Sequence, residues 1–365
     1  MENITALILV GGRGTRLQSL TNKKSKSYVS FFGKYRLIDF PLSSLSYSGI
    51  KNIGIITQYE PYDLMKYIGN GDSFDLDDFQ SGISFLTPYE DREVGFITQK
   101  GTANAVLSQI EFIKRCDSKY ILILSGDQVY QIDFNEILKS HIKRGAELTI
   151  ISKEIERSED LKRYGILELG SEKRVIGFEE KPENPKSNTI SLGMYLFSKE
   201  YLLNNLKMAS TLVDFGRDFI PYLINKKDKV YAYNHSGDFY DLGTVDGLYN
   251  ANMYYLDNPT KFNNKGDKFK IYSRSLDLPP SYIKNGSIIK NSIVSDGSLI
   301  SATITHSIIS YDVIINEGSK IENSIILPGA RIGKNTELKN VIIDENAIVK
   351  DNTIYSFSVP TLIEE

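Results

Sequence analysis

The chain has 365 residues, of which 41% are hydrophobic and 24% charged, and its formal net charge at pH 7 is -3. This balance is typical of a globular protein with room for two domains, and it excludes recognition of nucleic acid or an anionic membrane through overall positive charge. One cysteine, Cys116, excludes an internal disulfide framework, and with only three histidines the chain is a poor candidate for zinc. Any metal should therefore be a hard cation held by oxygen ligands.

No run of apolar residues is long enough to span a bilayer, and residues at the N-terminus do not have the pattern of a secretion leader. We therefore expect a cytoplasmic protein with no membrane and no nucleic acid among its partners.

The first predicted element is a buried strand at residues 7–10, which glycines follow directly. Without Cβ atoms, these glycines let backbone N–H groups approach a ligand closely, and two arginines in the same loop suit phosphate oxygens. The sequence therefore predicts a phosphate-binding loop at the end of a parallel strand, formed by Gly11, Gly12, Arg13, Gly14, Thr15 and Arg16. The loop lacks the third glycine of a dinucleotide fingerprint and the Gly-Lys-Ser/Thr of a Walker loop, and an ordinary glycine-rich turn is the alternative.

Further strands are predicted at residues 52–57, 120–124 and 148–151. Apolar residues at helical spacing predict a helix over 103–113, with Thr102 as its N-cap. Such alternation indicates an α/β fold with a mostly parallel sheet covered by helices on both faces.

The pattern changes after residue 258, where a polar linker over 259–283 precedes a repetitive segment over 284–365. Aliphatic residues there recur at six-residue steps, which predicts a parallel β-helix, with a set of ordinary short strands as the alternative. The stepped residues are Ile288, Val294 and Ile300, then Ile308 and Ile314, then Ile326, Ile332 and Leu338, then Ile342, Ile348 and Ile354.

Two acids and several lysines are candidates for chemistry. Asp127 ends the predicted strand at 120–124, where ligands bind in open α/β sheets, and Asp241 has a similar setting. Two carboxylates suffice for Mg²⁺ when phosphates supply further ligands, although a turn acid is the alternative for Asp127. Lys26 and Lys181 are candidates for substrate phosphates, whereas a solvated surface charge is the common role of a lysine.

Several motifs occur in the order seen in one enzyme family. They lie at residues 11–17, 33–43, 57–59, 100–103, 124–127, 178–182, 214–216 and 241–244. Together with the C-terminal repeats, they make the chain resemble the ADP-glucose pyrophosphorylases (glucose-1-phosphate adenylyltransferases) of bacterial glycogen synthesis. The resemblance covers nearly the whole chain. It implies a Rossmann-like, glycosyltransferase-A-like nucleotidyltransferase domain over 1–258, followed by a left-handed β-helix.

The resemblance also implies roles for individual residues. ATP would be bound by Leu9, Gly11, Gly12, Arg13, Gly14, Thr15, Gln58, Gly101 and Thr102. Glucose 1-phosphate would be bound by Gly165, Glu180, Lys181, Ser191, Tyr195 and Asp214. Asp127, Arg16 and Lys26 would be catalytic, and Asp127 and Asp241 would hold Mg²⁺ as the cofactor. Lys23 resembles a lysine that binds a phosphorylated activator in some allosteric members, and the family implies a homotetramer or a hetero-oligomer with a paralogous subunit.

The chain departs from the family pattern at three places. Prolines usually flank the lysine equivalent to Lys26, a Trp-Tyr pair usually precedes the motif at 100–103, and a histidine usually stands at Gln128. Two alternatives therefore stay open: a poorly catalytic regulatory subunit, and a pyrophosphorylase for another sugar nucleotide.

Overall fold

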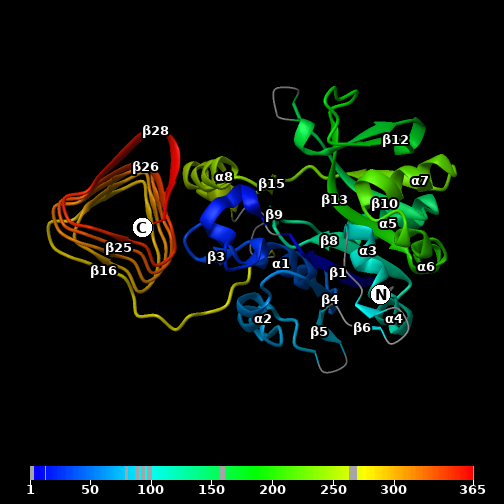
Figure 1. Ribbon diagram of the computed structural model, residues 1–365, viewed down its shortest axis with the longest axis horizontal. Coiled ribbons are helices and arrows are strands. Elements are labelled where there is room, and N and C mark those ends of the chain that lie inside the picture. The colour runs from blue at the N-terminus through cyan, green and yellow to red at the C-terminus, as the bar shows by residue number, and fades with distance from the viewer. Residues whose placement is uncertain are drawn as a thin grey trace.

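The computed structural model describes residues 4–12, 14–78, 81–87, 90–91, 95–96, 101–156, 161–262 and 269–364. The chain forms a sheet covered by helices and a triangular prism of stacked coils, joined by an extended segment (Figure 1). Within these described ranges, none of the helices combines the length and the apolar character that crossing a membrane would require.

The large sheet combines parallel and antiparallel pairs of strands. Its main path runs in the order β12 (Val175–Glu180), β11 (Gly165–Leu169), β13 (Thr189–Ser198), β8 (Tyr120–Ser125), β1 (Ile4–Val10), β4 (Asn52–Thr57) and β5 (Gly82–Leu86). The strands β10 (Leu148–Glu154) and β14 (Val230–Asn234) extend it from β13. The four strands β8, β1, β4 and β5 run parallel, so their carboxyl ends lie along one edge.

Helices cover both faces of this sheet, as the alternation of segments predicts. One face packs on α1 (Asp39–Tyr47), α2 (Tyr62–Ile68) and α5 (Phe134–Arg144). The other packs on α3 (Thr102–Leu107), α4 (Ile110–Arg115), α6 (Lys199–Leu206) and α7 (Ile220–Asn225). Neighbouring residues of β1 alternate between the two cores, Ala6 and Ile8 in one and Leu7 in the other. Because both faces are buried, the strand reads as a continuous apolar run.

The helix predicted over 103–113 is in fact two short helices, α3 and α4, and Thr102 is not its N-cap. Gly101 caps α3 instead, and the backbone leaves helical geometry at Gln109. The Ser108 hydroxyl donates to the backbone oxygen of Ala105 at 2.7 Å, a local bond that competes with helix continuation. Apolar spacing alone could not reveal this break.

Short ribbons and helices complete the first part. They are β2 (Ser30–Phe31) with β3 (Tyr35–Arg36), β6 (Glu90–Asp91) with β7 (Gly95–Phe96), β9 (Gln128–Tyr130) with β15 (Phe239–Asp241), α8 (Val245–Asp257) and α9 (Pro259–Phe262). Residues 269–281 then run without a helix or strand, and the backbone N–H of Tyr272 donates to Ser43 Oγ at 2.8 Å.

The prism is a parallel β-helix with three sides, as the repeats predict. One side consists of β16 (Tyr282–Ile283), β19 (Leu299–Ile300), β22 (Ile314–Ile315), β25 (Arg331–Ile332) and β27 (Ile348–Val349). The other sides contain β17 (Ile288–Lys290), β18 (Ile293–Val294), β20 (Thr303–Thr305), β21 (Ile308–Ile309), β23 (Lys320–Glu322), β24 (Ile325–Ile326), β26 (Glu337–Ile343) and β28 (Ile354–Ile363).

From Ile309 onward the steps between interior residues are six, six and five, whereas from Val294 to Ile309 they are six, four and five, so the six-residue step fails at several of the predicted positions. The interior sequence runs Ile309, Ile315, Ile321, Ile326, Ile332 and Leu338, and equivalent residues of adjacent coils such as Ser307 and Ser324 are 17 apart. Ile288, Ile348 and Ile354 therefore point outward, with 47%, 64% and 66% of their surface exposed. Ile289 and Val349 pack with the interior cluster instead.

The β-helix contacts the first part through an outward column of isoleucines. Ile308, Ile325 and Ile342 stand one above another in the coils and are buried. They belong to the same apolar cluster as Leu248 of α8 and Phe31. The two parts therefore share one core at their junction.

Glu345 forms the centre of a buried polar contact between the same two parts. Its carboxylate accepts hydrogen bonds from Ser30 Oγ at 2.7 Å and Arg36 Nη1 at 3.2 Å, and Lys24 Nζ lies 2.8 Å away. Burial raises the pKa of Glu345, but Arg36 and Lys24 more than offset it, so the pKa falls to about 2. The guanidinium of Arg36 also donates to the Tyr311 hydroxyl at 2.6 Å.

Candidate active site

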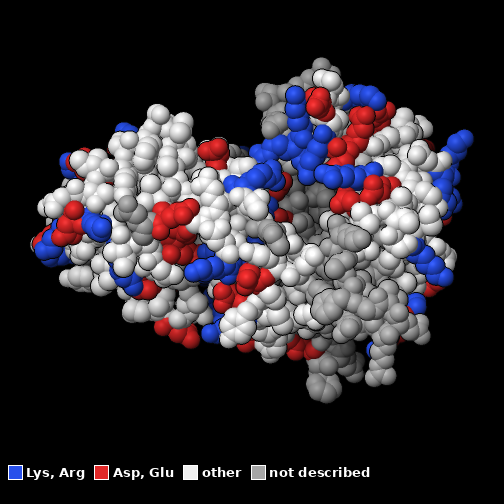
Figure 2. Space-filling model, viewed as in Figure 1, with Lys and Arg blue, Asp and Glu red and all other residues white. Residues whose placement is uncertain are grey.

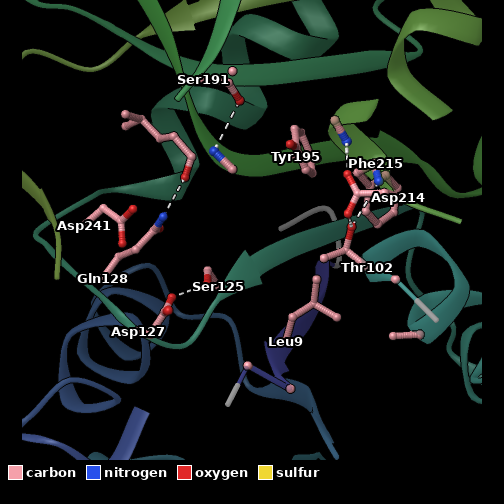
Figure 3. A pocket seen from close by; sticks show the side chains of 18 of the residues that line it. Leu9, Thr102, Ser125, Asp127, Gln128, Ser191, Tyr195, Asp214, Phe215 and Asp241 are labelled. Carbon is pink, nitrogen blue, oxygen red and sulfur yellow. Dashed lines mark hydrogen bonds between the residues drawn. The ribbon is translucent and has the colours of Figure 1, made fainter. Parts of the chain in front are cut away.

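A cavity of about 550 Å³ opens at the carboxyl ends of the parallel strands (Figure 3). Leu9, Ile56 and Ser125 line it from the ends of β1, β4 and β8. This is the edge at which open α/β sheets bind ligands, and the volume suits small molecules. Figure 2 shows Lys and Arg side chains gathered around the hollow on this face of the molecule.

The three residues Lys26, Asp127 and Asp241 meet on one side of the cavity. Lys26 Nζ donates to Asp127 Oδ2 at 2.5 Å and to Asp241 Oδ1 at 3.3 Å. Burial lowers the pKa of Lys26, but the two carboxylates outweigh it and the pKa rises above its ordinary value. Burial raises the pKa of Asp127, but Lys26 outweighs it and the pKa falls, so both acids face a charged ammonium.

The fold brings the two acids together although 114 positions separate them. Asp127 follows the end of β8, and its carboxylate accepts a hydrogen bond from Ser125 Oγ. Directly afterwards β9 pairs antiparallel with β15, a register that places Asp241 opposite Gln128. A two-strand ribbon thus fixes the spacing of the carboxylates.

These residues fit a divalent cation that also has ligands from a substrate. Hard cations take carboxylate oxygens, and a cationic nitrogen already lies between the two acids. Across the described ranges, no group of three or more acidic, histidine or cysteine side chains could hold a metal alone. The two carboxylates would therefore need phosphate or water oxygens to complete the coordination.

The glycine loop contributes only part of its predicted residues to the cavity wall. Gly11 and Gly12 line the cavity, whereas Gly14 and Thr15 do not. Gly14 has φ +63°, and a Cβ there would lie 3.0 Å from Thr21 and 3.3 Å from Lys26, so a larger residue would disturb the lysine. Arg13 lies outside the described residues.

Two of the predicted cations lie outside the cavity wall. Arg16 is exposed, and its Nη2 is 3.0 Å from the point that a Cβ of Gly243 would occupy, which places it beside the segment that carries Asp241. Lys23 is exposed on the same loop. Gln58, Gly101 and Thr102 line the part of the cavity wall where the resemblance places the nucleoside.

Thr102 and Asp214 hold that wall together. Thr102 Oγ1 donates to Asp214 Oδ2 at 3.0 Å and accepts from the Phe215 N–H at 3.0 Å (Figure 3). Asp214 Oδ1 accepts from the N–H groups of Gly216 and Arg217 at 3.0 and 3.1 Å. The threonine that the sequence predicts as a helix cap is therefore bonded to the segment at 214–216.

Glu180 ends β12 and Lys181 follows it, and both residues line the same cavity. Lys181 Nζ lies 3.4 Å from Glu180 Oε1, and burial raises the pKa of Glu180. A Cβ on Gly165 would lie 3.0 Å from Glu180 Oε2, and one on Gly216 would overlap the same oxygen. Gly216 therefore leaves room for this carboxylate, whereas Gly165 leaves room chiefly for the Phe178 ring. Ser191 and Tyr195 line the wall of the same cavity.

Comparison with known proteins agrees with this arrangement. The profile of the family described as Nucleotidyl transferase matches residues 5–258, and that described as GlmU-like, C-terminal hexapeptide, matches residues 281–356. Proteins named glucose-1-phosphate adenylyltransferase from Bacillus mycoides (strain KBAB4), Bacillus cereus (strain ATCC 10987 / NRS 248) and Bacillus anthracis are each 37% identical over 357 residues. These matches cover 97% of this chain and 94% of each relative.

The chain belongs to the glucose-1-phosphate adenylyltransferase family. In this family member the cavity wall also contains residues that sequence reasoning missed: Ser27, Arg163, Tyr164, Leu192 and Gly193. Ser27 and Gly193 could have been suspected from their neighbours, because Ser27 directly follows the candidate Lys26 and Gly193 lies two positions after the candidate Ser191. Arg163 had none, because its segment matches no motif and reaches the cavity only through the pairing of β11 with β12.

Proposed function

We propose that this member of the glucose-1-phosphate adenylyltransferase family joins ATP to α-D-glucose 1-phosphate with Mg²⁺ as cofactor, forming ADP-glucose and pyrophosphate. ADP-glucose would then supply glycogen synthesis. The observation that carries the proposal is the meeting of Asp127, Asp241 and Lys26 in a cavity at the carboxyl end of the sheet. The names of the Bacillus relatives support the choice of substrates.

The chemistry needs charge neutralisation more than a base. A phosphate oxygen of the sugar phosphate attacks the α-phosphorus of ATP in line, and pyrophosphate leaves. Because the nucleophile is already an anion, no proton has to be removed, which agrees with a cavity wall that contains no histidine among its described residues. Mg²⁺ between the acids would neutralise charge on the phosphates.

The chain's own groups would position the reactants. The backbone at Gly11 and Gly12 would approach the triphosphate, and Lys26, beside the two acids that would hold the cation, would bind phosphate oxygens. Glu180 and Asp214 accept hydrogen bonds from sugar hydroxyls. Arg16 beside Gly243 adds positive charge at the edge of the site.

A nucleotide panel tests the proposal. The purified protein is given glucose 1-phosphate and Mg²⁺ with ATP, UTP, dTTP or GTP, and pyrophosphate release is measured. We expect turnover with ATP to exceed turnover with the other nucleotides. Comparable or greater turnover with another nucleotide would contradict the proposal, as would no turnover by the chain alone.

We also propose that the chain assembles as a homotetramer or with a paralogous subunit, and that Lys23 receives a phosphorylated activator. Exposed apolar side chains on one side of the β-helix, Tyr282, Leu299 and Ile348, support contact with another chain. Light scattering of the purified protein tests the assembly. Titration of sugar bisphosphates against wild type and Lys23→Ala tests the activator, and equal responses would contradict its assignment.

A further inference from the structure

Arg163 has a buried guanidinium nitrogen without a partner among the described residues. The residue ends the short helix η4 (Leu161–Arg163) and lines the cavity. Its Nη2 is buried and has no hydrogen-bond partner in the part of the chain that the structure describes. Buried donors in native proteins are almost always satisfied, so a ligand in the cavity is a natural source of the missing acceptor.

The segment that carries Arg163 is fixed directly beside Lys181. The antiparallel ladder of β11 and β12 pairs Gly165 with Glu180. One further backbone hydrogen bond extends the ladder beyond this pair. In that bond the N–H of Lys181 donates to the backbone oxygen of Tyr164 at 3.1 Å. Arg163 and Lys181 therefore come from neighbouring backbone segments and line one cavity.

Without Arg163, the side chains around Lys181 carry too much negative charge to bind a sugar phosphate. Lys181 pairs with Glu180 at 3.4 Å, and the carboxylate of Asp214 lies close enough to influence Glu180. The two acids thus outnumber Lys181, whereas the phosphate of a hexose 1-phosphate brings further negative charge. Arg217 also faces Glu180, but it is exposed and does not line the cavity.

We propose that Arg163 binds the phosphate of the sugar 1-phosphate, a role that rests on the proposed function and specifies one of its subsites. The guanidinium offers parallel N–H donors to phosphate oxygens, and its buried Nη2 has no partner among the described residues. Lys181 then balances Glu180 and shares the phosphate with Arg163. The alternative ligand for Arg163 is the triphosphate of ATP, and the two are separated by experiment.

The test compares Arg163→Gln and Arg163→Lys with the control Lys162→Gln, the adjacent exposed lysine that does not line the cavity. Steady-state KM values are measured for glucose 1-phosphate and for ATP. For Arg163→Gln we expect the KM for glucose 1-phosphate to rise about tenfold to a hundredfold, the range for a lost charged hydrogen bond. The KM for ATP and the unfolding midpoint should stay near wild type.

Arg163→Lys should give an intermediate KM, because it keeps the charge and loses the planar pair of donors. Lys162→Gln should behave as wild type. An unchanged KM for glucose 1-phosphate in Arg163→Gln would overturn the proposal, and so would a rise confined to ATP. If Arg163→Gln does not fold, the decision rests on Arg163→Lys, whose KM for glucose 1-phosphate must exceed that of wild type.

Binding of glucose 1-phosphate is also measured by calorimetry without ATP. Weaker binding by Arg163→Gln than by wild type supports the role of Arg163 whether or not the chain forms ADP-glucose, and equal binding contradicts it. Failure of the wild type to release pyrophosphate would contradict the proposed function only. The two ideas can therefore fail separately.

Discussion

At the scale of single residues, the cavity depends on a cation held between two acids. Lys26 Nζ contacts both Asp127 and Asp241, so the carboxylates do not repel each other across an empty gap. The same position suits a divalent cation when nucleotide phosphates are present to complete its ligands. With such a cation held by Asp127 and Asp241, Lys26 would be available to bind phosphate oxygens.

Replacing Lys26 with methionine tests whether the lysine acts as the counter-ion of the two carboxylates. Lys26→Met leaves two carboxylates facing each other without a counter-charge, and breaking a buried pair costs roughly 3–5 kcal/mol. We expect the thermal midpoint in EDTA to fall by about 10 °C and to recover on addition of Mn²⁺ or Mg²⁺. Differential scanning calorimetry with and without metal measures both effects.

The matched control is Lys26→Met combined with Asp127→Asn, which removes one of the facing charges. Its midpoint should lie closer to that of wild type, and it should respond little to metal. If the thermal unfolding midpoint of Lys26→Met in EDTA equals that of wild type, the counter-ion role of Lys26 is contradicted. It is also contradicted if metal does not raise the midpoint of Lys26→Met.

Sequence motifs predicted many of the residues that line the cavity, but they did not predict which of these residues form ion pairs with one another. Asp127, Asp241, Lys26, Glu180, Lys181 and Asp214 all carry local signals and all line it. The contact of Lys26 with both acids could not be predicted, because it depends on how β9 pairs with β15. Arg163 is the same case, since only the ladder between β11 and β12 brings its segment beside Lys181.

At the scale of elements, the sequence of the β-helix reveals that aliphatic residues repeat, but it does not reveal which of them lie inside the coils. Several coils contain adjacent isoleucines, such as Ile308 with Ile309 and Ile325 with Ile326. One of each pair enters the coil interior and the other faces outward. Because both residues are aliphatic, composition cannot show which one lies inside, and the five-residue step moves the choice by one position.

Outward-facing isoleucines of the β-helix should contribute to stability only where they pack against the first part of the chain. Ile325→Ala removes a side chain that is 2% exposed within the junction core, so we expect a loss of about 2–5 kcal/mol in the free energy of unfolding. Ile354→Ala is the control, because this outward residue is 66% exposed, lies outside the side that carries Tyr282, Leu299 and Ile348, and should change stability by less than about 0.5 kcal/mol. Urea unfolding measures both, and equal effects would contradict the assignment of the column.

At the scale of the whole molecule, polar contacts connect the β-helix to the loop that carries Lys26. Glu345 pairs with Lys24, two positions before Lys26, and Asp344 accepts a hydrogen bond from Ser19 Oγ at 2.6 Å. The β-helix thus fixes both ends of the segment between the glycine loop and Lys26. This link arises from residues more than 300 positions apart and left no sequence signal.

The charge of Glu345 gives this junction a defined pH dependence. Its folded pKa of about 2 lies below the ordinary 4.5, so its stabilisation is complete above pH 4.5 and is lost as pH falls toward 2. That difference corresponds to about 3 kcal/mol. Glu345→Gln should therefore be less stable than wild type by about this amount at pH 7, with a gap that narrows below pH 4.5. Urea unfolding at several pH values checks this, and a pH-independent gap would contradict it.

The central claim is that Asp127 and its partners at the end of the sheet carry out adenylyl transfer. Pyrophosphate release from ATP and glucose 1-phosphate, measured for wild type and Asp127→Asn side by side, tests it most directly. We expect Asp127→Asn to keep its fold by circular dichroism and to lose at least ~10²-fold in turnover, the scale for losing one group that stabilises transition-state charge. Turnover close to wild type in that variant would contradict the claim.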